Sequence, residues 1–461
     1  MNKLLLVIFV IFNCYAISYA QSNEDEVSIF SIEEVHEDLD YWEQKLIKKN
    51  PLLYYYSSKE EINQGFKDIR KELNHSMSAV EFLNIVSLML HTIQDGHCSL
   101  HPSEEYIELI TQNEKLLAIE VLVANNQLFL QKNLSSNVLL PPIGAEILSI
   151  NGQPVEQIIQ STLNKLPNDG NSPFAIASLN ENFRYYYHVF QGFNDSYTLS
   201  FLVDGRMEDY IIKGMNLKSI RTRSGYKEAD CVAFWIADSA QTAYLTINTF
   251  DKTAIQKDCE LKFKKEIDRI FTELKTFKPQ NLVIDVRQND GGNPTYVKYL
   301  LKQLMLSNFT VNEECYVVKK KHATVFEDRV KRKWYPGYAL GSSKAKSNAY
   351  QGNVFVLISG YTFSAGVDLA NTIQKHHRGI LLGEESGGNP NIMGGYFLKT
   401  SWNLPNTGIQ ASISTLCTKG KLSQDNEGRG LIPDVQMTWN SNDSKEGQWD
   451  EILYNITQLT K

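Results

Sequence analysis

The sequence lacks a basic excess, a long apolar run and a dense set of cysteines. Its 46 Lys and Arg residues are outnumbered by 53 Asp and Glu residues, for a formal net charge of −7. Nucleic-acid-binding proteins normally carry a basic excess, so this charge argues against that class. No stretch offers the run of about 20 apolar residues that a membrane-spanning helix needs. Six widely spaced cysteines in 461 residues do not form a disulfide scaffold.

The first residues predict a segment that directs export. Lys3 precedes the apolar run LLLVIFVIF, and the small-x-small run SYA at 18–20 precedes Gln21. This pattern is typical of a signal peptide, so we expect residues 1–20 to be removed and the mature chain to be periplasmic or extracellular. Cys14 lacks the Leu-small-small pattern that precedes a lipoprotein cysteine, so we expect no membrane anchor. The cysteines that remain are odd in number, which leaves at least one thiol free.

The rest of the chain is long enough for more than one domain. Residues 28–92 place apolar side chains at helical spacing. Residues 116–213 show apolar runs separated by turn signals such as Asn125-Asn126, which predicts mostly strands. From residue 230 onward strand patterns alternate with helical ones, including one amphipathic helix expected over residues 254–275. This alternation favours a buried, largely parallel sheet.

Ser364, in the stretch YTFSAGVDL, lies between an apolar strand pattern and a helical pattern. A serine at the start of a helix is exposed and has free backbone N–H groups beside it, which a developing oxyanion requires. The Ala365 amide would be one such donor. The alternative is that Ser364, or Thr362, only caps the helix, and capping serines are far commoner than nucleophiles.

The stretch DVRQNDGG follows another apolar strand pattern and ends in Gly291 and Gly292. Paired glycines allow a backbone to approach a ligand closely and to present its N–H groups. Either glycine is therefore a candidate second donor to an oxyanion. The alternative is a tight strand-to-helix turn that binds nothing.

Two further stretches offer a base and its partner. His97, in QDGHCSLH, lies in a turn, and an imidazole with its ordinary pKa of about 6.5 can act as general base. Its alternatives are a metal site with Cys98 and His101, or a structural histidine. Glu427 opens EGRGLIPD, and a carboxylate that orients an imidazole is the usual third member of a triad. Its alternative is a role in a surface loop, with Asp434 as a turn residue.

The order of these motifs resembles that of peptidase family S41, which includes the C-terminal processing proteases and the tricorn-type core proteases. DGH, GAEILSINGQPV, LVIDVRQNDGG, TFSAG, GEESGG and EGRGLIPD follow one another over most of residues 92–437. The resemblance implies a multidomain α/β protein. Its parts would be an N-terminal helical region that supplies His97 (21–105), a PDZ-like β-rich domain (106–215) and a crotonase-like (ClpP/crotonase) catalytic core (216–461).

The resemblance also implies serine peptidase chemistry with no metal and no other cofactor. Processing proteases use a lysine as the base, but Asn389 stands at the matching position here. Tricorn-type proteases use a histidine and a glutamate, and His97 and Glu427 match those positions. We therefore expect a catalytic set of Ser364, His97 and Glu427, with the amides of Ala365 and of Gly291 or Gly292 around the oxyanion.

The function expected from this resemblance is a secreted or periplasmic serine peptidase that acts on peptide or protein substrates. Gly96 stands where tricorn-type sites have a serine beside the histidine, and the PDZ-like part has no clear carboxylate-binding loop. Two alternatives use the same scaffold. One is a protein that binds a ligand or peptide without cutting it, and the other is an esterase with the same triad.

Overall fold

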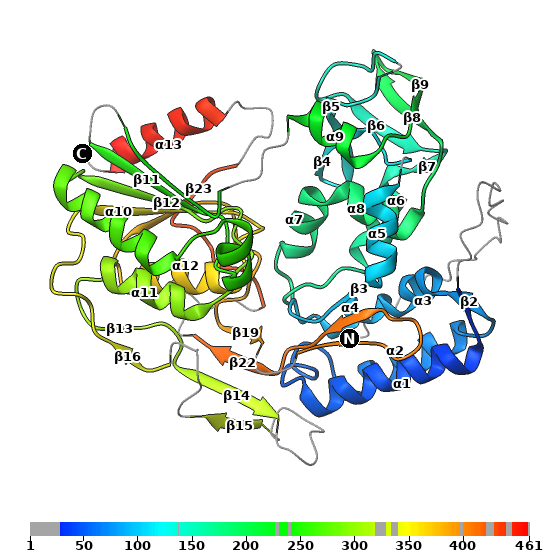
Figure 1. The fold of residues 1–461 in the computed structure, drawn as a ribbon, viewed down its shortest axis with the longest axis horizontal. Coiled ribbons are helices and arrows are strands. Elements are labelled where there is room, and N and C mark those ends of the chain that lie inside the picture. Colours follow the sequence, from blue (N-terminus) through cyan, green and yellow to red (C-terminus); the bar gives the residue numbers. More distant parts are fainter. Residues whose placement is uncertain are drawn as a thin grey trace, which may run out of the picture.

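The computed structural model divides the chain into three regions (Figure 1). We call residues 29–112 the helical region, residues 116–224 the middle β region and residues 231–459 the α/β region. The middle β region and the α/β region stand side by side, and the helical region lies below the former. The structure describes residues 28–113, 115–136, 138–225, 230–237, 241–318, 329–332, 340–396, 400–420, 428–438 and 445–459. The segment predicted to direct export lies outside these residues.

The helical region consists of short amphipathic helices with well-formed ends. Its elements are β1 (Ile29–Phe30), α1 (Ile32–Lys49), α2 (Lys59–Glu72), β2 (Met77–Ser78), α3 (Ala79–Val86), α4 (Leu88–Ile93), β3 (Ser99–His101) and α5 (Glu104–Gln112). Ser31 and Ser58 each form a capping box with the glutamate three residues later, which satisfies free N–H groups of α1 and α2. Gln94 ends α4 in the left-handed conformation, and the chain then enters the loop that carries His97.

The middle β region is an antiparallel sheet covered by helices on one side. The strands are β4 (Ile119–Ala124), β5 (Gln127–Asn133), β6 (Glu146–Ile150), β7 (Gln153–Pro154), β8 (Ser196–Val203) and β9 (Arg206–Lys213), in the order β4-β5-β6-β8-β9 with β7 beside β6. The helices are α6 (Val155–Leu163), α7 (Phe174–Glu181), α8 (Phe183–Gln191) and α9 (Leu217–Ser224). Asn125 and Asn126 both have positive φ and form the hairpin turn that the sequence predicts.

The α/β region contains a six-stranded sheet in the order β10-β11-β12-β17-β18-β23. The strands are β10 (Val232–Ile236), β11 (Thr242–Ile247), β12 (Asn281–Asp285), β17 (Asn353–Ile358), β18 (Ile380–Gly383) and β23 (Val435–Gln436), and only β10 runs antiparallel to its neighbour. On one face lie α10 (Phe263–Phe277), α11 (Pro294–Leu304) and α12 (Ala365–Lys375), and on the other lies α13 (Lys445–Leu459) (Figure 1). Helices on both faces explain why its central strands are apolar throughout.

Smaller sheets connect the α/β region to the helical region. Their strands are β13 (Phe309–Thr310), β14 (Glu314–Val318), β15 (Arg329–Arg332), β16 (Ser342–Ser343), β19 (Ile392–Gly395), β20 (Ser401–Asn403), β21 (Gln410–Ser412) and β22 (Leu416–Lys419). Strand β21 pairs with β3, directly after His97. Trp402 and Ile413 are buried in the apolar core that the helical and middle β regions share. The late part of the chain therefore returns to support the loop that carries His97.

The single helix expected over residues 254–275 is wrong. A π-helical turn, η1 (Ala254–Asp258), ends at Cys259, and α10 begins only at Phe263. Cys259 forms a disulfide with Cys231, and Glu260 has a φ of 51°, which an α-helix does not accommodate. Cys98, Cys315 and Cys417 are buried, and the structure shows no disulfide for them among the described residues. Within the described residues, no helix is both long and apolar enough to cross a membrane.

Candidate active site

Ser364 stands at the turn between β17 and α12 in a conformation that non-glycine residues rarely adopt. Its φ is 50° and its ψ is −118°, and its side chain makes no capping bond to the helix. The alternative of a simple N-cap is therefore wrong. Thr362 does not cap the helix either, because its hydroxyl donates to the Val286 carbonyl oxygen at 2.8 Å. Strain of this kind persists only where the surroundings impose it, and it is concentrated at functional sites.

The loop that follows β12 imposes this conformation. Strands β12 and β17 are parallel neighbours, so the segments after them leave the same edge of the sheet. The Phe363 amide donates to the Asn289 carbonyl at 2.9 Å, and the Ser359 hydroxyl donates to the Arg287 carbonyl at 2.6 Å. These bonds fix both sides of the turn and leave the Ser364 side chain half-buried.

His97 reaches this serine from the helical region. Its Nε2 atom lies 3.0 Å from Oγ of Ser364, although the two residues are 267 positions apart. Its imidazole packs against the rings of Phe363 and Tyr396, with centroids 4.7 Å and 5.3 Å away. The Tyr396 hydroxyl also donates to the His97 carbonyl at 2.8 Å. The structure thus brings together the serine and the histidine that the sequence singled out.

Burial determines the charge of His97. The side chain is only 4% exposed, and loss of water lowers its pKa to about 4, although the nearby Asp95 carboxylate opposes this shift. The imidazole is therefore neutral at pH 7 and can accept a proton from Ser364. Its Nδ1 atom is buried and has no partner within the part of the chain that the structure describes. Glu427, expected to orient the imidazole, lies outside that part.

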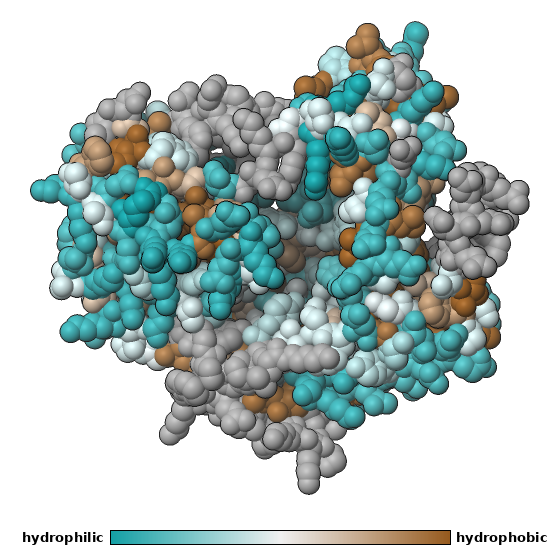
Figure 2. Space-filling model, in the orientation of Figure 1, coloured by the Kyte–Doolittle hydropathy of each residue, from teal (hydrophilic) through white to brown (hydrophobic). Residues whose placement is uncertain are grey.

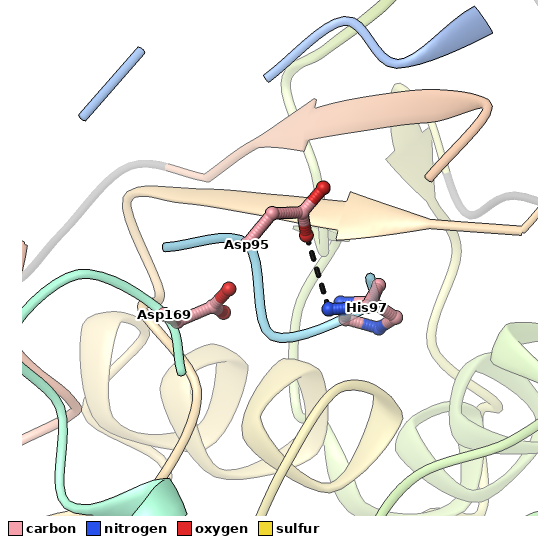
Figure 3. A group of neighbouring side chains, drawn as sticks. All are labelled: Asp95, His97 and Asp169. Carbon is pink, nitrogen blue, oxygen red and sulfur yellow. Dashed lines mark hydrogen bonds between the residues drawn. The ribbon is translucent and has the colours of Figure 1, made fainter. Parts of the chain in front are cut away.

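Two buried aspartates hold the loop around His97 (Figure 3). One Asp95 oxygen accepts bonds from the His97 amide and the Ser414 hydroxyl, both at 3.0 Å. Asp169 comes from the loop that precedes α7, and it accepts a bond from the Gly96 amide at 2.8 Å. Burial and the Asp95 charge raise the pKa of Asp169 to about 8. Sequence reasoning missed the role of Asp169, which stands in an ordinary turn signal, NDGN, far from the other motifs, and it took Asp95 only as part of the DGH motif.

The same three residues are the group of the described chain best arranged for a metal ion. Asp95, His97 and Asp169 offer ligand atoms within 4.8 Å of one another. Backbone and hydroxyl donors already occupy the carboxylate oxygens, and the imidazole already contacts Ser364. This donor set fits a network of hydrogen bonds better than a metal site. The other trio considered, His97 with Cys98 and His101, forms no such group among the described residues.

Gly291 and Gly292 lie directly beside the serine. A Cβ atom at Gly291 would stand 2.5 Å from Cβ of Ser364 and 3.1 Å from the Ala365 nitrogen, and one at Gly292 would stand 2.1 Å from the Phe250 backbone. Neither position tolerates a side chain. The two segments therefore approach as closely as glycine permits.

The hydrogen bonds of this loop separate the roles of the two glycine amides. The Gly291 amide donates to the Asn289 side chain at 2.9 Å, while the Gly291 carbonyl accepts from the Phe250 amide at 2.7 Å. Because the peptide bond is planar and trans, the Gly292 N–H points away from Phe250. Among the described residues, neither this N–H nor that of Ala365 has an acceptor. These two amides are available to a ligand.

Asn389, at the position where processing proteases place a lysine, supports the wall of the site. Its side-chain amide donates to the Tyr56 hydroxyl at 2.8 Å, and its backbone amide donates to Asp169 at 3.4 Å. Lys375, the nearest lysine before it in the sequence, donates to the Val311 carbonyl at 2.7 Å instead. His97 is therefore the base candidate that the geometry provides.

Comparison with known proteins places this arrangement in context. Residues 241–437 match the model of the family described as Peptidase family S41. The structure of mature CPAF superposes with a TM-score of 0.66 at 14% identity, over 93% of this chain and 97% of that chain. Mature CPAF complexed with lactacystin gives a TM-score of 0.67 at 13% identity, over 93% and 98%. At these identities the likeness concerns the fold. No curated protein matches the sequence.

Proposed function

The chain belongs to peptidase family S41 and is a serine-type peptidase, and we propose that Ser364 and His97 perform its chemistry. The observation that carries this proposal is the 3.0 Å contact between Nε2 of His97 and Oγ of Ser364, made by a serine in a strained backbone conformation. A serine hydroxyl is a weak nucleophile until a base removes its proton. Neutral His97 is positioned to be that base.

The reaction proceeds through an acyl-enzyme. Oγ of Ser364 attacks the carbonyl carbon of the scissile peptide bond while its proton passes to Nε2 of His97. His97 then gives this proton to the leaving amine, and the carbon–nitrogen bond breaks. Water, deprotonated by His97, attacks the resulting ester, and Ser364 regains its proton as the acid product leaves.

The backbone N–H groups of Ala365 and Gly292 hold the oxyanion in this proposal. Both are without an acceptor among the described residues, and a helix N-terminus favours negative charge. Gly291 contributes by allowing the close approach. Removing a single donor of this kind costs about 100-fold to 1000-fold in kcat in other enzymes.

Glu427 is proposed to accept a hydrogen bond from Nδ1 of His97. Two observations support this role. Nδ1 is buried without a partner among the described residues. The next residue along the chain, Gly428, accepts a bond from the Asn171 amide at 2.8 Å, and the loop of Asn171 also contacts the His97 loop through Asp169. A glutamate at this place would stabilise the imidazolium that forms during the reaction.

The proposal extends to the architecture. The parallel sheet with helices on both faces supports a crotonase-like core, proposed for residues 216–461, although α9 packs in the core of the middle β region. The antiparallel sheet of the middle β region corresponds to a PDZ-like domain, proposed for residues 106–215. The helices before it correspond to the N-terminal region, residues 21–105, which supplies His97.

The compartment proposed is the periplasm or the extracellular space, after removal of residues 1–20. The Cys231–Cys259 disulfide supports this, because disulfides form and persist in oxidising compartments and are rare in the cytosol. The substrates proposed are peptides or proteins, without nucleic acid and without a membrane anchor. Figure 2 shows the surface hollowed between the middle β region and the α/β region, which leaves room for a polypeptide to approach.

The test is reaction of the mature protein with a fluorophosphonate probe, followed by mass mapping of the labelled residue. We expect labelling at Ser364, much slower labelling in His97→Ala, and none in Ser364→Ala. A folded wild-type protein that stays unlabelled would favour the binding-protein alternative. A matched panel of peptide and ester substrates then separates a peptidase from an esterase.

A further inference from the structure

Strand β4 is an edge strand, yet its free side is closed. It stands at one end of the order β4-β5-β6-β8-β9. Edge strands expose backbone N–H and C=O groups, and an extended peptide can bind by adding a strand there. Leu117, Ile119 and Val123, along this edge, are 0%, 2% and 5% exposed. Residues 120–122 and 124 of β4 are only partly buried, so the hydrogen bonds of this edge decide whether it is open.

Side chains of α7 and α8 take the place that a peptide backbone would occupy. The Arg184 guanidinium donates to the carbonyls of Leu117 and Ile119 at 2.8 Å and 2.6 Å. The Leu117 amide donates to Nε2 of His188 at 2.9 Å. The Val123 amide donates to the Asn180 side chain at 2.9 Å. Two N–H groups and two C=O groups of β4 and the segment just before it are thus satisfied by side chains of the same chain.

Helix α7 also contacts the catalytic turn. The ring of Phe174, its first residue, stacks on Phe363 with centroids 4.1 Å apart, and Phe363 in turn packs against His97. At the other end of α7, Glu181 accepts a bond from Gln288 at 3.0 Å. The helix therefore lies between β4, on which it packs, and the segments around Ser364 (Figure 1). A peptide strand that ran from β4 to Ser364 would have to displace it.

The charges at this edge also disfavour a carboxylate. Two cations stand at or near this edge: Lys115 pairs with Asp195 at 2.9 Å, and two nitrogens of Arg184 are used by backbone carbonyls. The Glu120 carboxylate acts electrostatically on the same guanidinium, so an incoming carboxylate would meet a negative charge. The amides of Leu117 and Val123 already have acceptors, so these two N–H groups are not free to capture a chain terminus.

We propose that this peptidase cleaves internal bonds of extended polypeptides and does not hold the C-terminal carboxylate of its substrate. Helices α7 and α8 close the β4 edge, and substrate reaches Ser364 without pairing to β4. This inference rests on the proposed function for the cleavage itself. The closure of the edge stands on the contacts of Arg184, Asn180 and His188 alone.

The first experiment compares two peptide libraries of equal length and random internal sequence, one with free C-termini and one amidated. Products are read by mass spectrometry. We expect values of kcat/KM that agree within about twofold, and cut sites at all distances from the C-terminus. A preference of about tenfold or more for free carboxylates would overturn the proposal.

The second experiment measures hydrogen exchange of the segment 115–125 and needs no activity. We expect slow exchange in the wild type and faster exchange in Arg184→Ala and Asn180→Ala. The control is Arg223→Ala, which removes a similar guanidinium-to-carbonyl bond, to Ser135 at 3.0 Å, elsewhere in the same region. Slow wild-type exchange with no cleavage of either library would refute the proposed peptidase but leave the edge closed. Fast exchange in the wild type would refute the closure.

Discussion

The two halves of the site are held in different ways. Ser364 belongs to the α/β region, where the Phe363 amide and the hydroxyls of Ser359 and Thr362 donate to backbone carbonyls of the segment after β12 and force its conformation. His97 belongs to the helical region, and its loop is held by buried polar side chains, above all Asp95 from the same loop and Asp169 from the middle β region. The nucleophile depends on contacts within one region, and the base depends on buried carboxyl groups and a strand contributed by other regions. Single substitutions should therefore affect the two halves differently.

The largest effect is expected at Ser364, where loss of the hydroxyl should abolish activity and a glycine should relieve the backbone strain. Both Ser364→Ala and Ser364→Gly should lower kcat/KM by about 10⁴-fold or more, since the nucleophile is lost. The glycine variant should be more stable than the alanine variant by about 1 kcal/mol, because glycine adopts a φ of 50° without strain. Chemical denaturation of the two variants measures this difference. Equal stabilities would show that the turn is not strained.

The next effect is expected at Gly291, where a side chain would collide with the serine. Gly291→Ala should lower kcat by about 100-fold or more, because the added Cβ would stand 2.5 Å from that of Ser364. Gly152→Ala is the matched control. It also has positive φ, but it has open space around it and lies far from the site. If both variants lose the same activity, the close approach at Gly291 has no role in catalysis.

A smaller effect on activity is expected at Asp169. Asp169→Asn keeps an acceptor for the Gly96 amide, so kcat should fall by about tenfold or less while KM changes little. Its pKa is raised to about 8, so between about pH 4 and pH 8 the folded protein keeps a proton that the unfolded chain releases. The free energy of unfolding of the wild type should therefore fall as pH rises through this range.

The substitution Asp169→Asn should reduce that fall. The exposed Asp209→Asn on β9 is the control and should leave the pH profile as it is. Denaturation at several pH values between these limits provides the measurement. A profile for Asp169→Asn that coincides with the wild type would show that the carboxyl group ionises normally in the folded protein.

The smallest effect on activity is expected from the Cys231–Cys259 disulfide. Its removal by paired serine substitutions should lower stability by about 3–4 kcal/mol, the chain-entropy value for a loop of this length. Activity at 25 °C should change little, because the bonds of Phe250 to the Gly291 loop remain. Melting temperature and kcat/KM, measured together, test this. A large fall in kcat at low temperature would mean that the disulfide holds the oxyanion loop in place.

The same contrast explains what the sequence could predict. The turn of Ser364 and the glycine loop were accessible because each is a local strand-turn-helix pattern. His97 was a candidate base because it lies in a turn, but only the order of the motifs paired it with Ser364, since nothing local indicates that it meets a residue 267 positions away. Asp169 and the closure of β4 by Arg184 gave no signal, because such contacts depend on packing between regions. The pairing of Cys231 with Cys259 could not be read from an odd set of widely spaced cysteines.

The pairing of β3 with β21 has a consequence for when the active site forms during synthesis of the chain. The loop of His97 is held by Ser414, which donates to Asp95, and by β21, which precedes Ser414 and pairs with β3. Asp95 and Ser414 are 319 positions apart. The ribosome synthesises His97 early and Ser414 and β21 late. Contacts between residues so far apart in the sequence form slowly. We therefore expect the nascent chain to carry no working site until nearly all of it has been made. A protease that folds in this order cannot cleave itself or neighbouring proteins before its synthesis is nearly complete.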